Sequence, residues 1–96
     1  MQFKEFNYVW FDDEIIELAN AKVPLMTHAL HYGTSVIEGI RAYATKDNLY
    51  IFRAADHMKR LHKSAMVYSI TIKNSVNELV DATVETIKKN QIKNSC

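Results

Sequence analysis

Glycine and proline are scarce in this chain, and both glycines lie close together. At average usage a chain of 96 residues should contain about seven glycines and about five prolines, and this one contains two and one. A disordered chain, a collagen-like repeat and a flexible linker all need more of these residues, so none of them fits. The two glycines are Gly33 and Gly39, six positions apart.

Cysteine and long apolar runs are also nearly absent. The single cysteine, Cys96, excludes a disulfide within the chain and suits a reducing compartment. The first residues, MQFKE, contain no apolar stretch typical of a signal peptide. No apolar run approaches the ~20 residues that a membrane span requires. We therefore expect a cytoplasmic protein without a membrane partner.

No charge of one sign dominates the whole chain, but its halves differ. Twelve Lys and Arg against eleven Asp and Glu give a net charge of +1. This balance argues against a nucleic-acid partner or an anionic membrane surface. Residues 1–52 carry four basic and seven acidic side chains, and residues 53–96 carry eight and four. The basic half could face a phosphate, or it could be a solvated helical surface.

The first half of the chain contains patterns typical of two β-hairpins. Aromatic and β-branched residues at 8–11 and 14–18 flank Asp12-Asp13, and a second pair of strands at 34–43 and 49–52 flanks a Lys-Asp-Asn turn. Between the hairpins, 27–32 is predicted as one helical turn that ends at Gly33. Alternation along 34–43 places Val36, Glu38, Ile40 and Ala42 on one face.

Two helices are predicted in the second half. Apolar residues recur at helical spacing directly after Phe52, and Ser75 with Glu78 fits a capping box before the last helix. Lys88 and Lys89 fall in its last turn, where the helix dipole favours cations. Strands followed by helices favour an α+β domain over residues 1–96, with two antiparallel hairpins forming a sheet packed against two helices.

Candidate site residues cluster in the 34–43 strand and the helix after it. Gly39 inside a strand indicates a bulge, or a flat wall against a ligand. Arg41 on the same face is a candidate carboxylate anchor or the partner in an ion pair, and Arg60 is a surface charge or a phosphate clamp. His28 and His31 make half a metal site at best, while His57 and His62 do not share a face, so no metal is expected.

Three segments carry a resemblance to a known family. Residues 28–43 read HALHYGTSVIEGIRAY, 49–53 read LYIFR and 56–65 read DHMKRLHKSA. Together they resemble the branched-chain amino-acid aminotransferases, enzymes of fold type IV that depend on pyridoxal 5'-phosphate. The resemblance spans nearly the whole chain. It implies that the parent enzyme passes the amino group of leucine, isoleucine or valine to 2-oxoglutarate.

The resemblance also implies roles for five residues. Arg60 matches the arginine that holds the cofactor phosphate, and Ile37, Gly39 and Arg41 match the strand that lines the substrate pocket. Tyr32 matches a tyrosine that reaches the pocket of the neighbouring subunit, which implies a homodimer. Bacterial members often have phenylalanine where this chain has Ile37.

The family's catalytic lysine is absent from this sequence. In the family it lies in the large C-terminal domain, and none of the lysines here has a matching context. The resemblance therefore implies the small N-terminal domain of a longer enzyme, inactive and without bound cofactor by itself. Two alternatives stay open: a fragment of a D-amino-acid aminotransferase or aminodeoxychorismate lyase, and a non-catalytic dimerisation or binding domain. A Tyr-x-Arg strand directly after Cys96 would favour the branched-chain aminotransferase.

Overall fold

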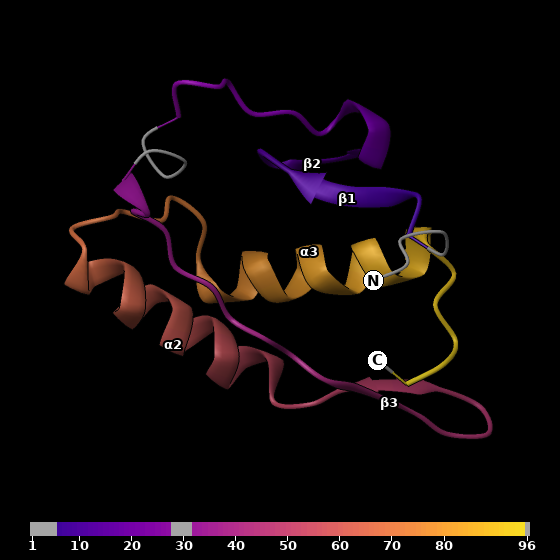
Figure 1. Ribbon diagram of the computed structural model, residues 1–96. Coiled ribbons are helices and arrows are strands. Elements are labelled where there is room, and N and C mark those ends of the chain that lie inside the picture. Colours follow the sequence, from indigo (N-terminus) through magenta and orange to yellow (C-terminus); the bar gives the residue numbers. More distant parts are fainter. Residues whose placement is uncertain (1–5, 28–31, 96) are drawn as a thin grey trace.

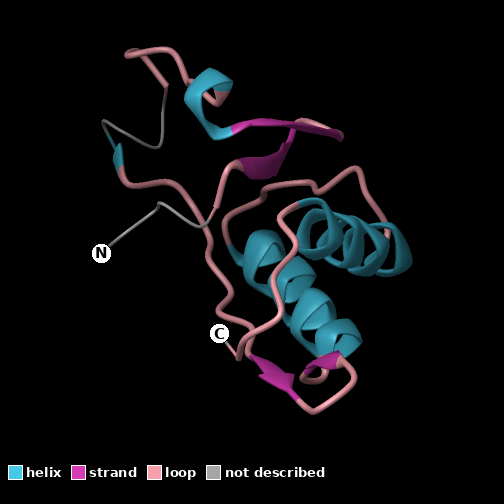
Figure 2. Ribbon diagram, turned by 90° about the vertical axis from the view of Figure 1, so that its right-hand side faces the viewer, coloured by secondary structure: helices cyan, strands magenta, loops and turns pink. Residues whose placement is uncertain are grey.

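Two β-hairpins and two long helices make up the computed structural model, which describes residues 6–27 and 32–95. Figure 1 shows the hairpins above and below the helix pair, and Figure 2 shows the same arrangement after a quarter turn. The elements are β1 (Tyr8–Phe11), β2 (Glu14–Glu17), the 3-10 helix η1 (Leu18–Asn20), β3 (Ala42–Ala44), β4 (Leu49–Ile51), α2 (Ala54–Val67) and α3 (Val76–Lys89).

The first hairpin closes through the turn that the sequence predicted. Phe11 pairs with Glu14, so Asp12 and Asp13 alone form the loop. Their φ angles are 49° and 72°, and positive φ at both central residues defines the type I′ turn that matches the twist of two antiparallel strands. Aspartate tolerates this left-handed conformation better than most residues do.

The second hairpin is shorter than predicted. Of the expected strand 34–43, only Ala42 and Tyr43 pair, at the start of β3, with Ala42 opposite Ile51. The partner strand β4 ends at Ile51, because α2 begins at Ala54. The last hydrogen bond between the two chain segments runs from the Phe52 N–H to the Arg41 carbonyl, at 2.7 Å. Residues 34–41 are therefore outside any strand. The α+β class with two hairpins and two helices is confirmed, although the hairpins form two separate two-stranded sheets.

Both predicted helices are present, and α3 has the terminal signals that its sequence predicted. Ser75 accepts a hydrogen bond from the Glu78 N–H while the Glu78 side chain accepts one from the Ser75 N–H, which is the predicted capping box. Lys88 and Lys89 occupy the last turn of α3. α2 begins after Arg53, whose side chain pairs with Asp56 at 2.8 Å.

The buried core is small for a chain of this length. Among the described residues, Ala42, Met58, Ala65 and Leu79 are the buried apolar side chains. Met58 and Ala65 lie on α2 and Leu79 lies on α3, two helices that contact each other, and Ala42 is the first residue of β3. Much apolar surface remains exposed, including Tyr32, Ile37, Met66, Val67 and Tyr68. None of the helices in the described part of the chain is both long and apolar enough to cross a membrane.

Candidate functional site

The predicted pocket residues share the outward face of the extended segment 34–41. Exposure alternates along it: Ile37, Gly39 and Arg41 are exposed, whereas Val36, Glu38 and Ile40 are partly covered. This is the two-residue period of an extended chain, and it confirms the predicted division into two faces. Ile37 is 89% exposed. Figure 1 shows the segment running along the helix pair toward β3.

The structure explains glycine at position 33 but not at position 39. Gly33 has a φ of +66°, which favours glycine, and directly follows the helical Tyr32. Most of the predicted turn at 27–32 lies outside the described residues. Gly39 does not have a positive φ, and a Cβ built on it would have no atom within 4 Å. The described chain therefore gives no reason for glycine at position 39, so the bulge that the sequence left open is not seen.

Arg41 and Arg60 differ in their partners. Arg41 is exposed and makes no ion pair with any residue in the described ranges, so the predicted alternative of a neighbouring partner is not seen. Arg60, in the middle of α2, donates two hydrogen bonds to Glu38 Oε1, from Nε at 2.8 Å and from Nη2. Its side chain is still 66% exposed. Arg60 therefore forms an ion pair with the extended segment and is not an unpaired surface charge.

Glu38 is the residue that sequence reasoning missed. Its side chain is only 6% exposed, and His57 Nδ1 lies 2.8 Å from the same Oε1 that Arg60 contacts. Hydrogen bonds from Arg60 and then His57 hold the pKa of the Glu38 carboxyl at about 2, below its usual 4.5. A signal was present, because Glu38 is the one carboxylate on the otherwise apolar inward face, and a covered carboxylate requires partners.

The residues present fit an anion better than a metal. An arginine side chain has five N–H donors, and Glu38 takes two of those on Arg60, so the exposed guanidinium keeps donors for a phosphate. No group of three His, Cys, Asp or Glu side chains in the described ranges could hold a metal ion. His28 and His31 lie outside those ranges.

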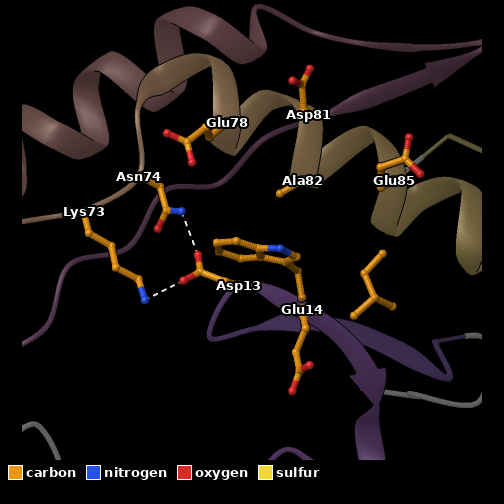
Figure 3. Close-up of a pocket in the computed structure, with 10 residues that line it drawn as sticks. Asp13, Glu14, Lys73, Asn74, Glu78, Asp81, Ala82 and Glu85 are labelled. Atoms are coloured by element: carbon orange, nitrogen blue, oxygen red, sulfur yellow. Dashed lines mark hydrogen bonds and ion pairs between the residues drawn. The ribbon is translucent and has the colours of Figure 1, made fainter.

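A separate shallow groove lies between the first hairpin and α3 (Figure 3). Asp13 at the hairpin tip contacts Lys73 Nζ at 2.5 Å and accepts a hydrogen bond from Asn74 Nδ2 at 2.7 Å. These two partners lower the pKa of Asp13, and the carboxylate raises that of Lys73. None of the predicted site residues lines this groove, so we interpret it as the junction that fixes the hairpin on the α2–α3 connection.

Comparison with known proteins gives close relatives, although no family model matches the chain. The branched-chain-amino-acid aminotransferase of Escherichia coli K12 is 45% identical over 92 residues, which cover 96% of this chain and 30% of that protein. The crystal structure of the E. coli enzyme superimposes with a TM-score of 0.88 at 45% identity, over 93% of this chain and 29% of the other.

A second relative has been solved with a phosphopyridoxyl compound bound. The T.th. branched-chain amino acid aminotransferase complexed with N-(5'-phosphopyridoxyl)-L-glutamate has a TM-score of 0.90 at 39% identity, over 96% of this chain and 31% of that one. In both fold and sequence the chain is therefore similar to part of these aminotransferases. It is homologous, over nearly its whole length, to part of the branched-chain aminotransferases. The chain spans about 30% of the length of the relatives it matches.

Proposed function

We propose that residues 1–96 are the small N-terminal domain of a branched-chain amino-acid aminotransferase. The observation that carries the proposal is the outward face of segment 34–41. Its predicted pocket residues Ile37, Gly39 and Arg41 are all exposed. The chain that carries them matches about 30% of the length of such an enzyme. The open space beside Gly39 supports this proposal. No described residue requires glycine at this position, whereas a substrate that approaches the backbone there would.

The proposed roles follow from the chemistry of each side chain. Arg60 holds the cofactor phosphate through the guanidinium donors that Glu38 leaves unused. Ile37 provides an apolar contact for a branched aliphatic side chain, and Gly39 leaves room for it. Arg41 anchors a carboxylate, such as that of 2-oxoglutarate, because its planar fork suits bidentate pairing. Tyr32 contributes to the pocket of the neighbouring subunit in a homodimer.

This domain supplies binding and orientation rather than the chemical step. Pyridoxal phosphate, when bound in the complete enzyme, supplies the electron sink for transfer of the amino group. The proton shuttle is a lysine of the larger domain, so the catalytic set contains no residue of this chain. Arg60 and the outward face of segment 34–41 orient the reactants and exclude water. The 96-residue chain alone should therefore not catalyse transamination.

Substrates, assembly and location form part of the same proposal. The names of the relatives support leucine, isoleucine and valine as amino donors. Exposed apolar side chains support burial against the larger domain and in a homodimer. The near absence of cysteine supports a cytoplasmic location.

The direct experiment assays the full-length protein that contains this chain. We expect transfer of the amino group from L-leucine to 2-oxoglutarate, and no transfer from D-alanine. Activity with D-alanine alone would favour the D-amino-acid aminotransferase, and complete inactivity would favour a binding domain. After reduction with borohydride in the presence of equimolar pyridoxal phosphate, the separately expressed 96-residue chain should show no single lysine that is modified in preference to the others. A reducible adduct at one site would contradict the proposed division of labour.

The role of Arg60 has its own test. Arg60→Ala in the full-length protein should weaken the affinity for pyridoxal phosphate about tenfold, because a phosphate loses charge-assisted hydrogen bonds. Absorbance titration of the apoenzyme measures this. Lys59→Ala is the matched control, since Lys59 is the adjacent exposed cation on α2. Equal affinities for the Arg60 and Lys59 variants would exclude Arg60 as the phosphate ligand.

A further inference from the structure

Within the described residues, segment 34–41 lacks the backbone pairing that usually fixes an extended chain. In the described structure its backbone hydrogen bonds lie near its ends, from the Ser35 N–H to the Gly33 carbonyl at 3.0 Å and from the Phe52 N–H to the Arg41 carbonyl. The stretch between them contains Ile37 and Gly39. Its position must therefore be set by side chains.

Glu38 provides that side-chain attachment. It lies between Ile37 and Gly39 and points to the opposite face, where its side chain is 6% exposed. Its Oε1 atom accepts from Arg60 Nε and Nη2 and lies 2.8 Å from His57 Nδ1. His57 and Arg60 are three residues apart, so they share one face of α2. One carboxylate thus joins the middle of the segment to the helix that carries Arg60.

We propose that Glu38 is a positioning residue, which orients Arg60 toward the cofactor phosphate and holds Ile37 and Gly39 in the pocket wall. This inference rests on the proposed function of Arg60. An exposed arginine normally loses rotamer freedom when it binds an anion. Glu38 fixes the Nε–Nη2 edge of the guanidinium beforehand, so the remaining donors are already oriented.

A competing electrostatic effect has the opposite sign. The negative charge of Glu38 repels a phosphate, so its removal could strengthen cofactor binding. The geometry favours the orienting effect. The Glu38 carboxylate is covered, and Arg60 and His57 both contact it. We expect the loss of orientation to exceed the relief of repulsion.

The test is a double-mutant cycle in the full-length apoenzyme, titrated with pyridoxal phosphate. Glu38→Gln preserves the side-chain shape but removes the charge, and should weaken the affinity about 3- to 10-fold. In the Arg60→Ala background the same change should have no further effect, because the group that Glu38 positions is gone. Glu85→Gln, an exposed carboxylate on α3, is the control and should leave the affinity unchanged.

Three results would overturn the inference: an unchanged affinity in Glu38→Gln, an increased affinity, or an equal loss in both backgrounds. The last would indicate general damage to the fold. If Arg60→Ala itself leaves the affinity unchanged, the phosphate role fails and the positioning role fails with it. If only Arg60→Ala weakens binding, the proposed function stands and the role of Glu38 does not.

A measurement on the wild-type protein covers the case in which Glu38→Gln does not fold. The Arg60 Nε–H signal, assigned in a nitrogen-15 NMR spectrum by its loss in Arg60→Lys, should exchange slowly with water before and after pyridoxal phosphate is added. Fast exchange in the cofactor-free protein would show an unfixed guanidinium and would overturn the inference.

Discussion

Asn90 and Tyr8 form a reciprocal pair of hydrogen bonds across 82 positions of the sequence. The Tyr8 N–H donates to Asn90 Oδ1 at 2.9 Å, and Asn90 Nδ2 donates to the Tyr8 carbonyl at 2.8 Å. Lys89 Nζ lies 4.8 Å from the centre of the Tyr8 ring, a cation–π contact. The start of the first hairpin is thus fixed to the end of the last helix by side chains rather than by a shared sheet.

Asn90→Ala should lower the free energy of unfolding by about 1–3 kcal/mol through loss of the two hydrogen bonds to Tyr8, each worth roughly 0.5–1.5 kcal/mol, besides the bond from Asn90 Nδ2 to the Thr86 carbonyl. Urea unfolding followed by circular dichroism measures the change. Asn77→Ala is the matched control, since Asn77 is exposed on the same helix and alanine favours helix there. Equal losses in the two variants would show that the Asn90–Tyr8 pair contributes nothing specific.

Ser75→Ala should cost about 1 kcal/mol of stability, because the Glu78 N–H at the start of α3 loses its acceptor. Ser75→Asp should retain most of the stability, since aspartate caps helices equally well. Thermal unfolding of the two variants separates the cap from a general effect of substitution. A Ser75→Asp variant as unstable as Ser75→Ala would contradict a capping role.

The two glycines should respond oppositely to substitution. Gly33→Ala should lower the free energy of unfolding by roughly 1 kcal/mol, because its φ of +66° disfavours a Cβ. Gly39→Val should leave the fold intact, since no atom lies within 4 Å of the added Cβ, yet it should reduce leucine transamination in the full-length enzyme by filling the pocket. Thermal melts and steady-state rates measure the two effects. Normal activity of Gly39→Val would remove Gly39 from the wall.

Acid should destabilise the protein in part through Glu38. Its pKa is lowered from 4.5 to about 2 in the folded chain, so its contribution is fully present above pH 4.5 and is lost as the pH falls toward 2. Asp13 and Glu78 also have lowered pKa values and act in the same direction.

The variant Glu38→Gln isolates the Glu38 contribution, because Asp13 and Glu78 remain unchanged in it. The difference in unfolding free energy between wild type and variant should be largest above pH 4.5 and should decrease as the pH falls through about 2. Urea unfolding at several pH values measures this difference. A difference independent of pH would show that the Glu38 carboxylate is not stabilised by its ion pairs.

Local signals predicted most of the elements correctly. The Asp12-Asp13 turn and the capping box at Ser75 are confirmed, because each depends on residues within a few positions of one another. The predicted strand at 34–43 was wrong over most of its length. A strand exists only where another strand pairs with it, and the partner of this one ends at Ile51. Propensity within 34–43 contains no information about where that partner stops.

The sequence by itself determined the two faces of segment 34–41, because alternation is a property of the extended backbone, and it identified Arg60 as a candidate ligand for phosphate. Only the tertiary structure decided that Glu38 joins them, since residues 38 and 60 meet through the packing of an unpaired segment on α2. The tertiary structure likewise showed that the backbone conformation favours glycine at position 33 but not at position 39. Contacts between distant residues depend on how the elements pack, and no local pattern in the chain specifies which residues will meet.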